Sequence, residues 1–283
     1  MTASDVVLIT GCSSGIGRET AKLLAREGYT VYATARRPES IADLGELGCR
    51  LLPLDVTDEE SATAAVKAVE DAEGAVDVLV NNAGINEIGA METVPLDLVR
   101  RIFETNVFGA IRMSQLVLPG MRRQRHGVII NLGSMLGRFT FPGMGSYCAT
   151  KHSLEAISDA LRHEVRPFGV KVSLIQPGMV RTEFGESAAE RRASDDGVDG
   201  AYGNYNEAIA EFTHTWKEGA AARLACGADD VAETILKAIK SPRARYRVAA
   251  SARMLMATRK MLPDVAFDAF MRTQFPSPTT AGD

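Results

Sequence analysis

The chain has 283 residues, of which 46% are apolar and 24% are charged, and its net charge is −4. This composition is typical of a globular protein in water, and the acidic balance argues against a surface that binds nucleic acid. No apolar run reaches transmembrane length, and the first residues leave no room for a signal peptide, so we expect a cytoplasmic protein that does not span a membrane.

A short apolar run followed by closely spaced glycines opens the chain. Residues 5–10 are nearly all apolar and β-branched, which is typical of a strand buried on both faces of a parallel sheet. A helical pattern begins within the glycines, and a strand, a glycine loop and a helix N-terminus together can bind a pyrophosphate. We favour this interpretation over a glycine-rich turn without a ligand, and we assign to the cofactor site Gly11, Ser13, Ser14, Gly15, Ile16 and Gly17.

The end of the second predicted strand, residues 29–35, bears on the choice of cofactor. An NAD site usually has a carboxylate there, which binds the ribose 2′-OH. This chain instead has Ala35, followed by Arg36 and Arg37. A guanidinium binds a 2′-phosphate in a bidentate manner, whereas a carboxylate would repel it. The segment therefore favours NADP(H) over NAD(H), although two arginines also commonly open a solvated helix.

A third strand is predicted over residues 50–55, and it ends at a carboxylate. Asp55, with its neighbour Val56, is placed to contact the adenine of a bound nucleotide. The alternative is that Asp55 caps the following helix, which is the more frequent role for an aspartate in such a position. Asp58 competes for that cap.

A fourth strand is predicted over residues 76–80, and an Asn-Asn-Ala-Gly run follows it directly. In open α/β sheets, ligands lie at the carboxyl ends of the strands. Asparagine side chains there can hold neighbouring backbone and tolerate unusual dihedral angles. We therefore assign three residues of the run to the cofactor site, namely Asn82, Ala83 and Gly84.

Residues 95–125 have a helical pattern with a break near Asn106 or Pro119. Asparagine has poor helix propensity, so Asn106 indicates a local role such as holding a water or a kink, although an exposed asparagine also fits. The helix has an apolar surface that is too broad to pack on one sheet alone, and a partner subunit is a candidate to cover it. The positions of this surface are Val107, Phe108, Ile111, Gln115 and Val117.

The chemistry is concentrated around Tyr147 and Lys151, which lie one turn apart on the same face of a predicted helix. A phenol has a pKa of about 10, and a neighbouring ammonium stabilises the phenolate and lowers that pKa. A fifth strand, residues 127–133, ends just before Ser134, whose hydroxyl can hold a substrate oxygen against the phenol. The three side chains predict a proton-transfer site for an oxygen that changes between C=O and CH–OH. The Tyr-Lys pair alone is weak evidence, and its weight comes from the other motifs.

The remaining segments complete the fold and cover the site. We expect a sixth strand over 170–175, a helix over 229–239 and a last strand over 246–249. Residues 183–216 lack strong periodicity, and an irregular insertion at the carboxyl edge of a sheet is more often a substrate lid than a linker. Residues 252–275 form an apolar helical segment that could lie on a membrane or cap a pocket. Packing against its own domain or a partner subunit is the more common arrangement.

Strands and helices alternate along the chain, which predicts an α/β fold. We expect a single doubly wound Rossmann domain over residues 1–283, with a seven-stranded parallel sheet and helices on both faces. The histidines and the four cysteines have no metal spacing, so we predict no metal site and reduced thiols. Cys148 lies about 100° around the helix from Tyr147, which favours a packing role over a redox switch.

These motifs occur together in a specific order, and the set covers roughly residues 5–182: Thr10-Gly-x-x-x-Gly-Ile-Gly17, Asn81-Asn-Ala-Gly84, Asn106, Ser134, Tyr147-x-x-x-Lys151 and Pro177-Gly178. In this order and spacing they resemble the classical short-chain dehydrogenases/reductases. Parts of the chain are similar to the NADP-using branch that contains hydroxysteroid and retinol-type dehydrogenases.

The resemblance implies an oxidoreductase that interconverts a secondary alcohol and a ketone or aldehyde by direct hydride exchange with the nicotinamide. It implies that Tyr147 is the general acid/base and Ser134 steadies the substrate oxygen. Lys151 lowers the phenol's pKa and bonds the nicotinamide ribose, and Asn106 holds a water in the proton path. Tyr147 and Lys151 also count as cofactor-binding residues. The nicotinamide-side loop is expected to contribute Pro177, Gly178, Val180 and Thr182.

The resemblance also implies a homodimer or homotetramer, paired through two long helices at about 95–124 and 147–168. A bulky apolar alcohol or ketone is the substrate class that this branch favours. The alternative function is a non-catalytic, NADP(H)-sensing binding protein on the same fold. Such a protein would be expected to lose a catalytic residue, and this chain has lost none.

Overall fold

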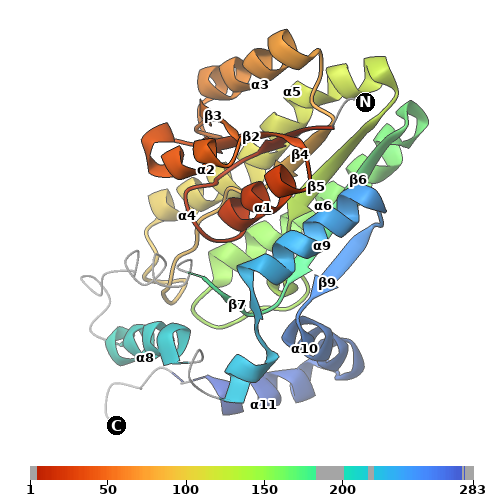
Figure 1. Ribbon diagram of the computed structural model, residues 1–283. Coiled ribbons are helices and arrows are strands. Elements are labelled where there is room, and N and C mark those ends of the chain that lie inside the picture. Colours follow the sequence, from red (N-terminus) through yellow and green to blue (C-terminus); the bar gives the residue numbers. More distant parts are fainter. Residues whose placement is uncertain (1–4, 183–200, 216–219, 276, 278–283) are drawn as a thin grey trace.

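A computed structural model describes residues 5–182, 201–215, 220–275 and 277. Its centre is a seven-stranded sheet in which every neighbouring pair is parallel, in the order β3-β2-β1-β4-β5-β6-β9. The strands are β1 (Val6–Ile9), β2 (Thr30–Ala35), β3 (Arg50–Pro53), β4 (Val78–Asn81), β5 (Gly127–Leu132), β6 (Val170–Pro177) and β9 (Arg245–Val248). The predicted doubly wound α/β fold is therefore confirmed (Figure 1).

The strand order reverses between β1 and β4, which are neighbours in the sheet. The connection after β1 leads towards β3 on one side, and the connections after β4 lead towards β9 on the other. Outside the carboxyl ends of two such strands the loops diverge and leave a crevice, where α/β proteins bind their ligands. The crevice is open to the glycine loop after β1 and to the Asn-Asn-Ala-Gly run after β4.

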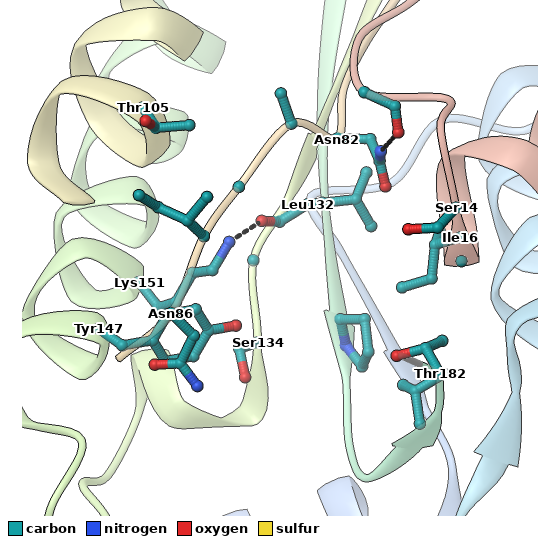
Figure 2. A pocket seen from close by; sticks show the side chains of 18 of the residues that line it. Ser14, Ile16, Asn82, Asn86, Thr105, Leu132, Ser134, Tyr147, Lys151 and Thr182 are labelled. Atoms are coloured by element: carbon teal, nitrogen blue, oxygen red, sulfur yellow. Dashed lines mark hydrogen bonds between the residues drawn. The ribbon is translucent and has the colours of Figure 1, made fainter. Parts of the chain in front are cut away.

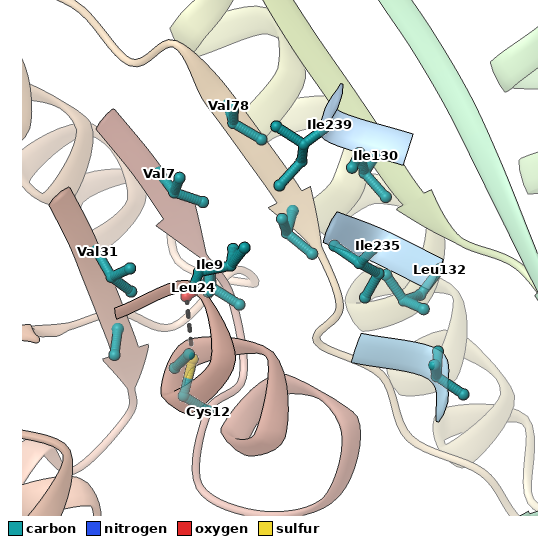
Figure 3. Packing of buried hydrophobic residues seen from close by; sticks show 14 of the residues in the cluster. Val7, Ile9, Cys12, Leu24, Val31, Val78, Ile130, Leu132, Ile235 and Ile239 are labelled. Carbon is teal, nitrogen blue, oxygen red and sulfur yellow. Dashed lines mark hydrogen bonds between the residues drawn. The ribbon is translucent and has the colours of Figure 1, made fainter. Parts of the chain in front are cut away.

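One face of the sheet is covered by α1 (Gly15–Arg26) and α9 (Ala228–Lys240), which lie side by side (Figures 1 and 3). Leu24 of α1 and Ile235 of α9 pack onto aliphatic side chains of the strands in one buried cluster. Cys12 is fully buried in the same cluster, and burial raises the pKa of its thiol to about 12. A thiol in this environment stays protonated and packs as a small apolar side chain.

The other face is covered by α3 (Glu59–Glu73), α5 (Gly109–Gln124) and α6 (Gly145–Val165). Helix α4 (Leu96–Phe103) continues into α5 through a π-helical turn, Glu104–Phe108. The predicted break near Asn106 is confirmed, whereas the alternative break at Pro119 is wrong, because Pro119 lies inside α5.

The broad apolar surface predicted for this helix is only partly exposed. Val107 and Val117 are buried in the core of their own chain, which corrects that prediction for these two positions. Phe108 is 49% exposed, and Gln115 is exposed as well. The π-helical turn shifts the helix register, so positions chosen from a continuous 3.6-residue period do not all share one face.

The carboxyl side of the sheet carries α8 (Gly203–Thr215), α10 (Ala250–Met261) and α11 (Asp264–Gln274), at the lower end of Figure 1. The predicted irregular course of 183–216 is wrong for α8, while 183–200 and 216 lie outside the described residues. Smaller elements complete the described chain, namely α2 (Ala42–Glu46), β7 (Val180–Arg181), β8 (Cys226–Gly227) and short 3₁₀ turns at Pro38–Ile41, Met135–Gly137, Arg166–Phe168 and Ala220–Leu224.

The C-terminal segment 252–275 packs against its own chain. Its buried side chains join a third apolar cluster that also contains Tyr147 and residues of α8, and these side chains are Ala252, Met256, Phe267, Met271 and Phe275. Of the arrangements considered from the sequence, packing on the same domain is the one observed. None of the helices that the structure describes is both long and apolar enough to cross a membrane.

Candidate active site

A cavity of about 590 Å³ lies in the crevice at the carboxyl ends of the central strands (Figure 2). Ser14, Ile16 and Thr182 border one side, and Ser134 and Tyr147 lie across from them. The residues assigned from the sequence line this cavity, except for Gly17, Arg37 and Asn106. One continuous space therefore joins the glycine loop to the Tyr-Lys pair.

The glycine loop is fastened to the loop after β4. The Asn82 side chain donates hydrogen bonds to the carbonyls of Thr10 and Gly11, both at 2.9 Å. Gly11 has φ +73°, and a Cβ there would lie 2.9 Å from the Cα of Ala83. A Cβ on Gly17 would overlap both Asn82 and the Gly11 carbonyl, so Gly17 permits this close packing without touching the cavity.

The N-terminus of α1 fits a phosphate group. The Ser14 side chain makes no capping hydrogen bond, and the first turn of α1 contains no acidic residue. Backbone N–H groups at a helix N-terminus bind anions, and here they border the cavity. The residues present therefore fit a dinucleotide whose pyrophosphate lies against α1.

The two candidate arginines are placed differently. Arg36 lines the cavity at the end of β2, whereas Arg37 is exposed away from it. Arg18, which the sequence interpretation missed, donates to the carbonyls of Ser13 and Ser40 at 3.3 and 3.4 Å. It thereby ties the glycine loop to the segment that follows Arg36. No spacing rule marks Arg18, because one of its partners, Ser40, comes from a different connection of the sheet.

Asp55 and Asp58 also separate into different roles. Asp58 is the N-cap of α3 and accepts a hydrogen bond from the backbone N–H of Ser61 at 2.7 Å. Asp55 does not cap this helix, since its carboxylate accepts from the backbone N–H and hydroxyl of Thr57 at 2.9 and 2.7 Å. Asp55 and Val56 both line the cavity, at the end where β2 and β3 finish.

Asn106 is buried, only 2% exposed, and it bridges two elements of the site. Its amide oxygen accepts from the N–H of Ile85 at 2.8 Å, and its amide nitrogen donates to the carbonyl of Ile85 at 2.9 Å. The same nitrogen donates to Thr150 on α6 at 3.2 Å. An exposed asparagine is thereby excluded. The π-helical turn directs Asn106 inward, where it fixes the loop after β4 beside the helix that carries Tyr147.

Lys151 and Tyr147 project from α6 towards the cavity (Figure 2). The ammonium of Lys151 donates to the carbonyl of Leu132 at 2.7 Å and lies 5.4 Å from the centre of the Tyr147 ring. Burial lowers the pKa of Lys151 from 10.5 to about 8, because an ammonium is poorly solvated there. At neutral pH this side chain remains charged.

Burial raises the pKa of the Tyr147 phenol well above its ordinary value, while its hydrogen bond with Ser134 acts in the opposite direction. The lowering of this pKa expected from the neighbouring ammonium is therefore outweighed by loss of solvent. The phenol is therefore protonated at neutral pH. Cys148 is fully buried beside it, and burial raises the pKa of its thiol to about 11, in keeping with a packing role.

The cavity wall near Tyr147 contains residues that the sequence did not indicate. Most are apolar and come from three different segments, namely Leu136, Phe141, Met144, Met179 and Phe212. Asn86 adds an amide near Ser134 and Tyr147 (Figure 2). These positions carry no periodicity, because they lie in loops and in α8. In the part of the chain that the structure covers, no cluster of His, Cys, Asp or Glu could hold a metal ion.

The chain has clear relatives among known sequences and structures. A family model described as short chain dehydrogenase matches residues 5–193. Human 17-beta-hydroxysteroid dehydrogenase type 1 is 36% identical over 276 residues, covering 93% of this chain and 82% of that protein. A structure of serine dehydrogenase complexed with NADP+ is 28% identical with TM-score 0.74, covering 86% and 94% of the two chains. 3-Ketoacyl-(acyl-carrier-protein) reductase from Brucella melitensis complexed with NADH is 26% identical with TM-score 0.71, covering 86% and 96%.

Proposed function

Because the chain belongs to the short-chain dehydrogenase family, we propose that it is an NADP(H)-dependent oxidoreductase that interconverts a secondary alcohol and a ketone or aldehyde. The observation that carries the proposal is that Ser134, Tyr147 and Lys151 border the same cavity as the N-terminus of α1. A dinucleotide and a substrate bound in this one cavity would both lie within reach of the proton-transfer groups.

Each catalytic side chain has a separate task in this proposal. A bound nicotinamide dinucleotide supplies or accepts the hydride. Tyr147 donates its phenolic proton to the substrate oxygen in reduction and takes a proton back in oxidation. Ser134 holds that oxygen by a hydrogen bond, and the ammonium of Lys151 stabilises negative charge on the phenol. Asn106 keeps the loop and α6 in place around them.

The cofactor-binding assignment follows the same cavity. Ser13 to Ile16 at α1 would hold the pyrophosphate, and Asp55 and Val56 would hold the adenine. Asn82–Gly84 and the loop Pro177–Thr182 would hold the nicotinamide end. Support for this arrangement comes from the lining residues, which are contributed by the carboxyl ends of β1, β3, β4 and β6.

The preference for NADP(H) rests on Arg36, which borders the cavity directly after Ala35. Replacing Arg36 by alanine is expected to raise the KM for NADPH about 10- to 100-fold, because charge-assisted hydrogen bonds to a phosphate contribute about 1.5–3 kcal/mol. The KM for NADH should change little. Arg37→Ala is the matched control, since Arg37 is exposed outside the cavity. Equal effects on NADPH and NADH, or a larger effect at Arg37, would contradict the assignment.

The substrate class is proposed from the wall beyond Tyr147, where aromatic and methionine side chains predominate. Such a wall favours a bulky apolar alcohol or ketone, and the human relative is itself named for a hydroxysteroid. Each methylene that is buried contributes about 0.8 kcal/mol. NADPH consumption measured with ketones of increasing chain length should therefore show kcat/KM rising up to about fourfold per methylene, until the cavity is filled.

The same panel of ketones tests the function itself. Small polar carbonyl compounds are expected to be poor substrates, and turnover of these in preference to long-chain ketones would exclude an apolar site. If no carbonyl or alcohol turns over while NADP(H) binding alters the affinity of a protein partner, the chain is a cofactor-sensing binding protein instead. The complete set of proton-transfer residues favours the enzyme.

Two further parts of the chain have proposed roles. We propose that 183–216 forms a lid over the substrate, since Phe212 of α8 already lines the cavity. We also propose that two or four copies assemble through the α4–α5 and α6 faces, where Phe108 is 49% exposed. The whole chain, 1–283, is proposed to fold as one domain around the sheet.

A further inference from the structure

The loop after β4 is fastened to four other parts of the chain. Each attachment is a hydrogen bond that involves a backbone group, and the loop also buries Ile88 in the third apolar cluster. The bonds join Asn82 to Gly11, Ile85 to Asn106, Glu87 to Tyr147, and Gly89 to Gly143. The first two bonds belong to the cofactor side and to the π-helical turn. The third joins the loop to the catalytic helix itself.

Glu87 supplies the cap that α6 lacks. The N-cap residue of α6, Met144, makes no side-chain hydrogen bond, and the first turn of the helix contains no acid. One carboxylate oxygen of Glu87 accepts from the backbone N–H of Tyr147 at 3.2 Å, and Ser146 donates to the carboxylate as well. A negative group at a helix N-terminus is stabilised by the free N–H groups and by the helix dipole.

This carboxylate is deeply buried, and keeping its charge there costs free energy. Glu87 is only 1% exposed, and its second oxygen has no hydrogen-bond partner among the described residues. Burial raises the pKa of Glu87, while hydrogen bonds from Ser146 and Tyr147 act against that rise. Because the folded-state pKa is raised, the ionised group costs stability at neutral pH. This cost is relieved as the pH falls through that pKa.

A glutamine could accept the same hydrogen bond without this cost, because its side chain is neutral. The acceptor oxygen, and not the charge, is therefore the property of Glu87 that the capping geometry uses.

We propose that Glu87 is a positioning residue for the reaction proposed above: as the acceptor that caps the first turn of α6, it holds Tyr147 against the loop after β4. The proposal rests on the proposed function for its catalytic consequence only. The capping contact stands on the geometry alone.

The positioning is tested in carbonyl reduction with Glu87→Ala, which removes the acceptor, and with Glu87→Gln, which keeps an acceptor oxygen but is neutral at every pH. In Glu87→Ala, kcat is expected to fall about three- to tenfold while the KM for NADPH is unchanged. In Glu87→Gln, kcat should stay within about twofold of the wild-type value. Rescue by glutamine is specific to the acceptor, since a general loss of packing would not be restored by it.

The cap is tested by amide hydrogen exchange at the first turn of α6, which needs no turnover. Glu87→Ala removes both the acceptor and the charge, and exchange at Tyr147 is expected to accelerate about tenfold. Glu87→Gln should exchange at the wild-type rate and unfold at or above the wild-type temperature at pH 7. The matched control is Glu92→Ala, since Glu92 is exposed and accepts a hydrogen bond from Tyr202 at 2.8 Å.

Each outcome decides one part of the proposal. An unchanged kcat in Glu87→Ala, or an equal loss in Glu87→Gln, overturns the positioning role, and unchanged exchange in Glu87→Ala overturns the cap. An effect of Glu92→Ala as large as that of Glu87→Ala overturns the specificity of the site. If the wild-type protein turns over no alcohol or carbonyl, the proposed function fails, whereas the exchange measurement still decides the cap.

Discussion

Tyr147→Phe is expected to lower kcat for carbonyl reduction by about 10²- to 10⁴-fold, which is the usual contribution of a positioned general acid. The substitution removes only the hydroxyl that lies beside Ser134 in the cavity. The ring is kept, and with it the packing in the third apolar cluster and the contact with Lys151 at 5.4 Å. The free energy of unfolding should therefore change by less than about 1.5 kcal/mol.

NADPH binding is measured separately from turnover. NADPH binding to the variant, followed by quenching or enhancement of cofactor fluorescence, is expected to match the wild-type protein, because the phenolic hydroxyl is one of many groups that line the cavity. The control is Tyr32→Phe, which removes a tyrosine hydroxyl that bonds Glu73 at 3.0 Å, away from the cavity. Retention of more than about a tenth of the wild-type kcat by Tyr147→Phe would contradict its role as general acid.

The central sheet could be predicted because its strands satisfy local rules. The run at β1 is apolar and short, is bounded by a polar residue and a glycine loop, and pairs with β2 and β4 on either side. The same holds for β5, which is buried along its whole length. Alternation of such runs with helical patterns leaves few topologies available, since parallel crossovers are nearly always right-handed.

Helix α8 could not be predicted in the same way. Its sequence has little amphipathic pattern, and it is held in place by contacts with distant residues. Tyr205 and Ile209 are buried in the third apolar cluster. The Asn206 side chain accepts a hydrogen bond from the backbone of Ala90 at 2.8 Å, more than a hundred residues earlier. Tertiary contacts of this kind override weak local preference, and they are invisible to periodicity.

The candidate site also has a part that could be predicted from the sequence and a part that could not. The Tyr147–Lys151 spacing is a local property of one helix and could be read directly from the sequence. Asn106 was marked by its poor fit to a helix, and its three hydrogen bonds now give the physical reason for the misfit. Arg18 and Glu87 have no such mark, because their partners are brought to them by the fold. Sequence reasoning therefore missed the polar contacts between separate loops, and it also missed the apolar cavity wall near Tyr147.

Lys151→Met is expected to have opposite effects on activity and on stability. The variant loses the charge that stabilises the phenolate, so kcat should fall by about 10²-fold or more. The buried ammonium, in contrast, destabilises the wild-type fold. Its pKa is lowered from 10.5 to about 8 by burial, and a difference of this size corresponds to roughly 3 kcal/mol. Methionine leaves the Leu132 carbonyl without its donor, which costs about 1–3 kcal/mol.

The net stability change at pH 7 is therefore expected to lie between zero and about 2 kcal/mol in favour of Lys151→Met. The sign follows from the lowered pKa: the cost of the charged lysine is fully present below pH 8 and disappears as the pH rises from about 8 towards 10.5. Denaturant unfolding at pH 7 and pH 9.5 should show that the stability advantage of the variant is smaller at the higher pH.

The control is Lys67→Met, at a 69% exposed side chain paired with Asp71, and it should change neither activity nor this pH dependence. A variant that unfolds more easily than the wild type at pH 7, with the same difference at pH 9.5, would mean that the hydrogen bond to Leu132 outweighs the burial of the charge.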